Sequence, residues 1–409
     1  MRRLLALLLV SFPALAAGPA TTNNDDSCDI AVQPAATLLL PYFDVDFDAP
    51  ASSSTTTLFT IQNVSPTPAI ANVTIWTDWG FPAVNFPIHL TGYDVQGINL
   101  YDLFTSGAIP ATACGGGNLS AFVTDLRFLF TTGKGAGATV ACTAAVGSVH
   151  PHAIGYVTVD LVSTCMSENA LSPNYFAHLL YDNVLTGDYQ QLQTSDDKHA
   201  YASAGPLVHI RAVPEGGPAG AVAATSLPYT FYDRFAPSDA LRKSDRRQPL
   251  PAVFAPRYIN GGTGAFNTSL KIWREGITLG ACSGAGAARS NSGMLVTDLV
   301  RFDEHENATV VPPPPAISAA PPGPPGLPAT LLLSAVNTTV LPPFSTSGDV
   351  SGWIYLNLDN QAMKGRASQN WVMTTMFAAP TYASEGTAVA LGNGCSPAVR
   401  HDAQIAPAP

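Results

Sequence analysis

Three aspartates alternate in the short segment FDVDFD near the start of the chain. On a β-strand, Asp44, Asp46 and Asp48 would point to the same side, because successive side chains lie on opposite faces. Clustered carboxylate oxygens are the ligands that Ca²⁺ prefers. The segment lacks the glycine and the distal glutamate of an EF-hand loop, and Val45 and Phe47 fit the buried face of a strand. The segment predicts either the solvated face of a strand, which we favour, or a calcium site.

A larger group of ionisable residues lies where the chain, otherwise poor in charge, concentrates arginine and aspartate. Its members are His209, Arg211, Glu215, Asp233, Arg234, Asp245 and Arg246. Arginines paired with aspartates can form a buried ionic network, whereas catalysis would require a carboxylate or a histidine with a shifted pKa in a cleft. We predict an ion-pair clasp between two units of the protein, with a catalytic cluster as the alternative.

Two further motifs carry potential metal ligands. Asp303-Glu304-His305-Glu306 follows a strand-like run, and His150-Pro151-His152 offers two imidazoles. The remaining ligands of either site would have to come from elsewhere in the chain, and the sequence identifies none of them. The first motif fits a charged turn, and the proline splays the two histidines. We favour these structural interpretations over a metal centre.

The motifs of the most recognisable enzymes are absent from the sequence. It contains no G-x-S-x-G elbow, H-E-x-x-H helix, P-loop or dinucleotide fingerprint. The paired carboxylates of a glycosidase need a geometry rather than a local motif, so that chemistry stays open. Exposed tryptophans could stack on sugars, but tryptophans on strands more often belong to the core. The five are Trp76, Trp79, Trp273, Trp353 and Trp371.

The elements that must position these residues are mostly β-strands. Residues 55–78 contain two alternating runs of β-branched and aromatic residues, joined by a connection with Pro66 and Pro68, and they predict a hairpin-like unit. The run AFVTDLRFLF, at residues 121–130, fits a short helix as well as a strand. Only 12% of the residues are charged, and glycine and proline abound, which favours short strands and many turns. We predict a mainly β protein with two tandem β-sandwich units of immunoglobulin-like type and short helices in the connections.

The second half of the chain echoes the first. The first pair of similar segments is FAPRYINGGTGAFNTSLKIWRE and LPYFDVDFDAPASSSTTTLFTIQN, and the second pair is GWIYLNLD and GYVTVDLV. At similar distances after the second pair come NWVMTTMF and NYFAHLLY. The expected organisation is a lead-in at 17–36, a first sandwich at 37–228, a charged junction at 229–251, a second sandwich at 252–397 with a proline-rich loop at 310–328, and a tail at 398–409. A single large sandwich built from both halves is the alternative.

The first 16 residues have the pattern of a secretory signal. Arg2 and Arg3 precede an apolar run, and a small-residue cleavage site ends at Ala16. Six cysteines follow, an even number that predicts disulfides in an oxidising compartment and leaves their pairing open. They are Cys28, Cys114, Cys142, Cys165, Cys282 and Cys395. No later segment has the ~18 uninterrupted apolar residues of a membrane helix. We expect an exported protein in the periplasm, on the cell surface or outside the cell.

Several blocks of the sequence resemble a group of secreted bacterial proteins known only as hypothetical. The blocks are LLLPYFDVD, TTLFTIQN, ANVTIWTDWGFPAVNF, LTGYDVQGINLYDLF, PLVHIRAVPEGG and RRQPLPAVFAPRYI. They are scattered over most of the chain that follows the signal. The resemblance implies export and a bacterial source, and it assigns no ligand and no catalytic residue.

Charge and composition together narrow the function. The formal net charge of −10 disfavours nucleic acid and anionic lipid as partners. We expect a non-enzymatic envelope or extracellular protein that acts in surface binding, adhesion or assembly, with an envelope protein or a glycan as its partner and no cofactor beyond the calcium considered above. A secreted hydrolase of polysaccharide is the alternative.

Overall fold

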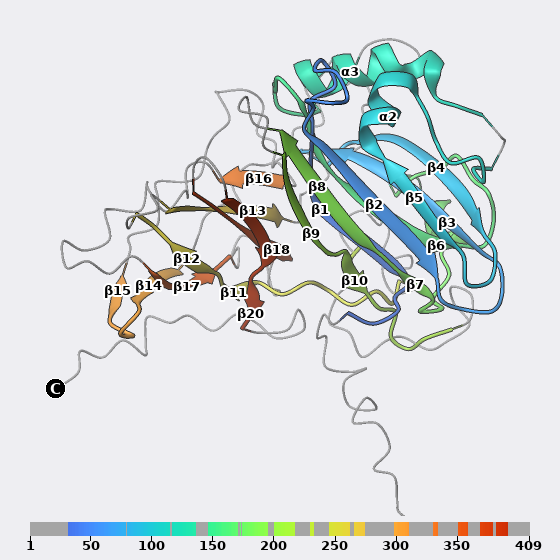
Figure 1. Cartoon of the computed structure of the whole chain (residues 1–409). Coiled ribbons are helices and arrows are strands. Elements are labelled where there is room, and N and C mark those ends of the chain that lie inside the picture. Colours follow the sequence, from blue (N-terminus) through green and yellow to red (C-terminus); the bar gives the residue numbers. More distant parts are fainter. Residues whose placement is uncertain are drawn as a thin grey trace, which may run out of the picture.

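The computed structural model describes residues 32–78, 80–114, 117–135, 146–170, 172, 174–194, 200–216, 230–232, 245–261, 266–274, 298–310, 330–333, 351–358, 369–378 and 382–391. Within these ranges the chain is mainly β, with antiparallel strands in four sheets (Figure 1). The mainly β prediction is confirmed. The immunoglobulin-like character of the units is consistent with the sheets and stays a prediction. The signal segment and the proline-rich loop beyond Val310 lie outside the described residues.

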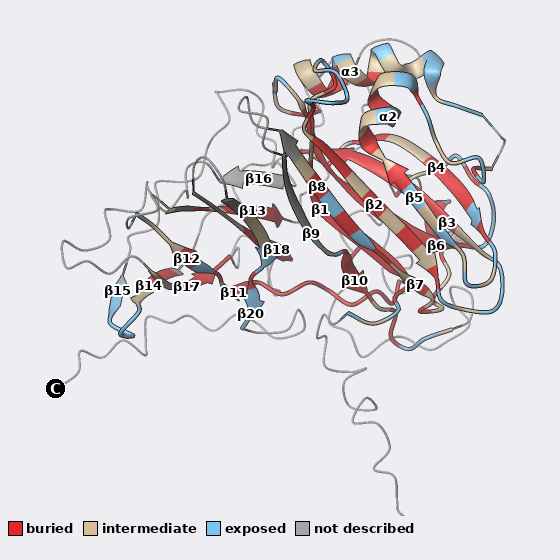
Figure 2. Cartoon of the chain, viewed as in Figure 1, coloured by how far each residue is buried: buried red, intermediate tan, exposed pale blue. Residues whose placement is uncertain are grey.

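The first half of the chain builds two sheets that enclose a common core. One sheet has the order β10-β1-β6-β3-β4, with β1 at Thr37–Val45, β3 at Ala69–Thr77, β4 at Pro82–Leu90, β6 at Ala153–Val162 and β10 at Val208–Ile210. All ten residues of β6 are buried, so this central strand is covered on both faces (Figure 2). A continuous apolar or small-residue run is the pattern that such a strand needs.

The second sheet has the order β5-β2-β8-β9. It contains β2 (Thr56–Asn63), β5 (Val95–Asn99), β8 (Asp188–Thr194) and β9 (Ala200–Pro206), and β7 (Leu185–Thr186) pairs with β2. In β2, Phe59 and Ile61 are buried while Leu58, Thr60 and Gln62 are half-buried. The period of two therefore puts one set of side chains into the core and leaves the other on an outer face.

Short helices connect these strands. They are α2 (Leu100–Ser106), η1 (Ser120–Phe122), α3 (Val123–Thr132) and α4 (Tyr175–His178). The ambiguous run at 121–130 is thus mostly helical, and its Leu126, Leu129 and Phe130 are buried at the three- and four-residue spacing of a helix. Asn99 caps the N-terminus of α2, where its side chain accepts a hydrogen bond from the Tyr101 N–H, and Gly107 caps the C-terminus with φ of 72°.

The second half repeats the strand order of the first. Its strands are β11 (Val253–Ala255), β12 (Arg257–Ile259), β13 (Phe266–Arg274), β14 (Asp298–Asp303), β15 (Ala308–Val310), β16 (Thr330–Leu333), β17 (Ser351–Asn357), β18 (Asn370–Ala378), β19 (Tyr382–Thr387) and β20 (Val389–Ala390). One sheet runs β20-β11-β17-β14-β15, with β12 also paired to β17, and the other runs β16-β13-β18-β19. Taken in chain order, these strands occupy the same places as β10-β1-β6-β3-β4 and β5-β2-β8-β9.

The two halves share a hydrophobic core. Trp273 of β13 lies edge-on to Tyr156 of β6 and stacks on Phe231, with ring centroids 5.9 and 5.6 Å apart. Edge strand β9 also lies beside edge strand β19 (Figure 1). The connection before β11 is buried from Asp245 to Leu250 and appears red in Figure 2, as a buried ionic network in the charged junction requires.

Two local expectations are wrong. β2 and β3 do not pair as a hairpin, because the connection with Pro66 and Pro68 carries the chain from one sheet to the other. The lead-in does not extend to residue 36, since Ala35 is buried and bridges to Leu185. Of the two segments that follow the repeated strands, NYFAHLLY contains helix α4 and NWVMTTMF lies in strand β18.

Candidate functional site

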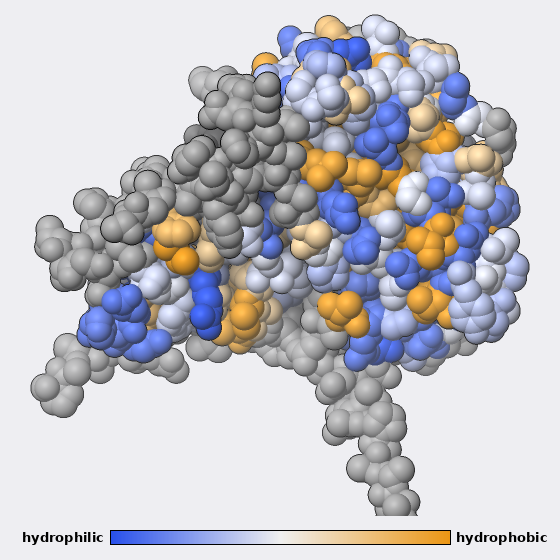
Figure 3. All heavy atoms as spheres, viewed as in Figure 1, coloured by the Kyte–Doolittle hydropathy of each residue, from blue (hydrophilic) through white to orange (hydrophobic). Residues whose placement is uncertain are grey.

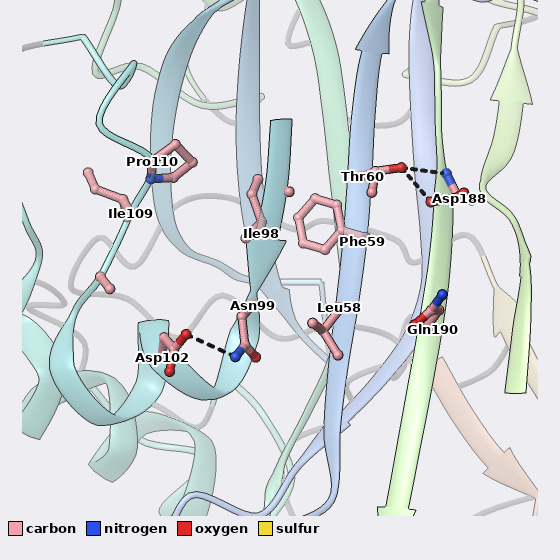
Figure 4. Close-up of a pocket in the computed structure, with 12 residues that line it drawn as sticks. Leu58, Phe59, Thr60, Ile98, Asn99, Asp102, Ile109, Pro110, Asp188 and Gln190 are labelled. Atoms are coloured by element: carbon pink, nitrogen blue, oxygen red, sulfur yellow. Dashed lines mark hydrogen bonds between the residues drawn. The ribbon is translucent and has the colours of Figure 1, made fainter. Parts of the chain in front are cut away.

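The outer face of the sheet β5-β2-β8-β9 carries a groove of about 400 Å³ (Figure 4). Strand register arranges its floor in two rows that cross the strands. Thr60 lies opposite Gly97 on β5 and hydrogen-bonds to Asp188 on β8. In the next row, Leu58 lies between Asn99 and Gln190. Since adjacent strands lie ~4.8 Å apart, each row spans about 10 Å.

One end of the groove is closed by the segment that follows α2. Gly107 ends this helix in the left-handed conformation, and a Cβ there would lie 2.3 Å from the Ser120 nitrogen, so only glycine fits. The chain then runs alongside β5, where Ala108, Ile109 and Pro110 line the groove (Figure 4). A disulfide between Cys114 and Cys165 anchors the far end of this segment. We call residues 108–114 the strap.

The charged groups that line the groove are carboxylates, which accept hydrogen bonds. Asp102 and Asp188 are exposed carboxylates, and their partners within the groove are neutral: Asn99 Nδ2 donates to Asp102 at 2.9 Å, and the Thr60 hydroxyl donates to Asp188. Among the residues that the structure describes, no lysine or arginine lines the groove. Figure 3 shows apolar patches among hydrophilic residues over this face of the first half. The surface is therefore negative, apolar in places and suited to a ligand that donates hydrogen bonds.

The described members of the predicted ionisable cluster lie away from the groove, and His209, Asp245 and Arg246 are buried. His209 is buried, accepts a hydrogen bond from the Gly187 N–H at 3.3 Å, and has a pKa lowered to about 4 by that burial. Arg211 reaches Glu215 at 3.9 Å. Arg246 stacks on Tyr181, its guanidinium carbon 4.0 Å from the ring centroid. Asp233 and Arg234 lie outside the described residues, and none of the others lines the groove.

The dominant buried ion pairs centre on Arg247, and of their members only Asp245 belongs to the predicted cluster. Arg247 is fully buried and contacts Asp245 at 3.1 Å and Asp160 at 3.5 Å. Burial acts to lower the pKa of Arg247, but these two carboxylates outweigh it and raise the pKa. Asp160 also accepts hydrogen bonds from the hydroxyls of Thr37, Tyr175 and Tyr232. Satisfied on every side, this network is structural rather than an open site.

A second buried pair links the two halves. The Lys271 ammonium lies 2.6 Å from Glu385 and donates to Gln191 of the first half at 2.8 Å. It also lies over the ring of Tyr42, 4.6 Å from the centroid. The hydroxyl of Tyr189 donates to the same glutamate at 2.9 Å. A contact between the halves thus exists, but through residues that the sequence did not single out.

Each of the alternating aspartates lies beside a basic side chain, and Asp44 and Asp46 share His152. Only Asp44 lies within β1, which ends at Val45, so the three do not share one strand face as predicted. His152 Nδ1 lies 3.0 Å from Asp44, and its Nε2 lies 3.7 Å from Asp46. Asp48 pairs with Arg127 of α3. A calcium site here stays a prediction; Val45 and Phe47 are buried, as expected.

The other motifs take ordinary structural positions. Asp303 accepts hydrogen bonds from the backbone N–H groups of His305 and Asn307, which forms a charged turn. The His150 ring contacts Asp78 at 3.0 Å. Among the tryptophans, Trp76, Trp273 and Trp371 are buried, Trp353 stacks on Phe302, and Trp79 lies outside the described residues.

Comparisons with known proteins give no family for this chain: no protein-family model, curated protein or solved structure matches it. Among the described residues, no helix combines the length and apolar character needed to cross a membrane.

Proposed function

We propose that this protein is an exported, non-catalytic binding protein whose groove holds a segment of a glycan. The observation that carries the proposal is the lining of the groove. Two carboxylates, two amides and a hydroxyl converge around the apolar side chains of Leu58, Ile109 and Pro110. A sugar offers the complement, with several hydroxyls that donate hydrogen bonds and C–H faces that pack on apolar atoms.

The setting supports recognition by a preformed surface. The floor belongs to three hydrogen-bonded strands, and the buried side chains of Phe59 and Ile98 hold it from below. A rigid floor limits the ordering cost of binding. The disulfide Cys114–Cys165 supports an oxidising compartment, in line with export.

A secreted polysaccharide hydrolase is the second candidate, because Asp102 and Asp188 line the same groove. In a glycosidase one carboxylic acid must hold its proton near neutral pH, which burial in an apolar pocket achieves. Both aspartates are exposed to solvent. This difference favours binding over hydrolysis.

Gly97 allows a direct test. A Cβ built on Gly97 meets nothing within 4 Å, so Gly97→Leu should fill the groove without disturbing the fold. Gly117, also exposed and with the same open surroundings, gives a matched control in Gly117→Leu. We expect a glycan panel to yield a ligand whose Kd rises at least about tenfold, or 1.4 kcal/mol, in Gly97→Leu and stays unchanged in the control.

Two outcomes would contradict the proposal. If a glycan ligand binds equally to both leucine variants, binding takes place outside the groove. If the wild type releases new reducing ends from the ligand, and Asp102→Asn or Asp188→Asn abolishes that release, the protein is a hydrolase.

A further inference from the structure

The disulfide that anchors the strap has a third potential ligand beside it. The Nε2 atom of His89 lies 3.3 Å from the Sγ atom of Cys165, and Cys114 supplies the other sulfur. These three ligand atoms lie within 4.8 Å of one another. His89 and Cys165 are exposed and Cys114 is half-buried, so solvent and small reagents reach the group.

Backbone hydrogen bonds hold two of these residues together without the disulfide. The N–H of His89 donates to the Thr112 carbonyl at 2.9 Å, and the N–H of Cys114 donates to the Pro87 carbonyl at 2.8 Å. Between them, Ile88 and Ala113 form a β-bridge. The strap is thereby added to the edge of β4, and His89 and Cys114 keep their spacing when the sulfurs are free.

The third residue is also held by the fold. Cys165 follows β6, and the segment before it is fixed where the N–H of Ser163 donates to the His178 carbonyl at 2.8 Å. The Cα atoms of Cys114 and Cys165 lie 5.9 Å apart. In a tetrahedral site with metal–sulfur bonds of ~2.3 Å, the two sulfurs lie about 3.8 Å apart. Rotation of the two side chains supplies this separation once the bond is broken.

We infer that His89, Cys114 and Cys165 form a Zn²⁺ site when the disulfide is reduced. A dithiol reductant supplies two electrons and two protons: the S–S bond breaks, two thiols form, and the dithiol becomes a disulfide. Zn²⁺ then displaces both thiol protons and binds two thiolates and the imidazole, with water in the fourth position. Thiolate and imidazole ligands favour such a borderline-soft ion over Ca²⁺ or Mg²⁺.

The consequence concerns the strap. In the oxidised protein the disulfide fixes the strap to the segment after β6, and in the reduced protein the metal ion takes over that link. The wall of the groove thus stays attached in both redox states. The inference depends on the three ligands alone and holds whatever ligand the groove binds.

The test uses the full chain with all six cysteines, after complete reduction by a phosphine and its removal under anaerobic conditions. Co²⁺ serves as a spectroscopic probe, because cobalt–thiolate bonds absorb in the near ultraviolet, and Zn²⁺ is then added to displace it. His89→Gln removes the imidazole and leaves every cysteine in place. His305→Gln, in the exposed turn of the second half, is the matched control.

We expect reduced wild type and His305→Gln to bind Co²⁺ with the thiolate band and to release it to Zn²⁺. In His89→Gln the affinity of this site for Co²⁺ should fall at least about tenfold. The double variant Cys114→Ser/Cys165→Ser should lose the part of the thiolate band that this site contributes in the wild type. The oxidised protein should show no band. Equal titrations of reduced wild type and His89→Gln, or an unchanged band in the double serine variant, would overturn the inference.

Discussion

Replacing Asp160 should strongly destabilise the protein, even when the new side chain has almost the same shape. One oxygen of its carboxylate accepts from Thr37 at 2.5 Å and faces Arg247 at 3.5 Å. The other accepts from the hydroxyls of Tyr175 and Tyr232. Asp160→Asn keeps the size of the side chain but turns one acceptor into a donor and removes the negative charge.

The expected loss follows from these contacts. Hydrogen bonds to a charged group contribute roughly 1.5–3 kcal/mol each. An amide oriented to keep Thr37 and Arg247 places its NH₂ against two tyrosine hydroxyls, and the reverse orientation places it against Arg247. Arg247 still pairs with Asp245 at 3.1 Å, which limits the damage. We expect a loss of about 3–5 kcal/mol, the cost of breaking a buried ion pair.

Urea unfolding followed by tryptophan fluorescence measures this loss. Asp188→Asn makes the same chemical change at an exposed position and should change the free energy of unfolding by less than about 0.5 kcal/mol. If Asp160→Asn shifts the unfolding midpoint no more than Asp188→Asn does, the network does not stabilise the fold and the reasoning fails.

Three further results are expected. Lys271→Met should lower the free energy of unfolding by about 3–5 kcal/mol, because it leaves Glu385 buried without its cation; adding Glu385→Leu should restore most of that loss, and no restoration would argue against the pair. The hydrogen bond to Asp44 raises the pKa of His152 above 6.5, so its stabilisation is present below pH 6.5 and is lost as the pH rises through the higher folded pKa; an NMR titration should show a midpoint above 6.5 that Asp44→Asn lowers. Burial lowers the pKa of His209 to about 4, so stability should fall as the pH falls from 6.5 towards 4, and its ring should not titrate between pH 5 and 8.

The sequence predicts where the strands lie better than it predicts which strands pair with each other. Alternation along residues 55–63 places Phe59 and Ile61 inside, as the structure confirms, because a strand that covers a core has a period of two. Pairing depends on contacts between distant segments, and local patterns do not encode it. For this reason β2 and β3, which are neighbours in the chain, belong to different sheets.

The sequence does not predict the groove either, because the groove depends on the pairing of distant strands. Thr60 and Leu58 are ordinary outward residues of β2, and Asp188 and Gln190 follow far along the chain. Only the register brings them into two rows. Gly97 is the one local signal, since a glycine inside a strand often marks a close approach by another group.

The repeated topology explains the limited sequence similarity between the two halves of the chain. Gly155 of β6 and Gly352 of β17 occupy the same place in the two halves, and a Cβ on either would lie 2.0 Å from a carbonyl oxygen of the neighbouring strand, that of Trp76 or Phe302. This shared steric need explains why glycine begins both GYVTVDLV and GWIYLNLD while most other positions differ. Positions under such a backbone constraint retain the common residue. The two halves therefore have one architecture. The aromatic core at Trp273 joins them, and separating the halves would expose these large aromatic surfaces to water, at a cost in free energy.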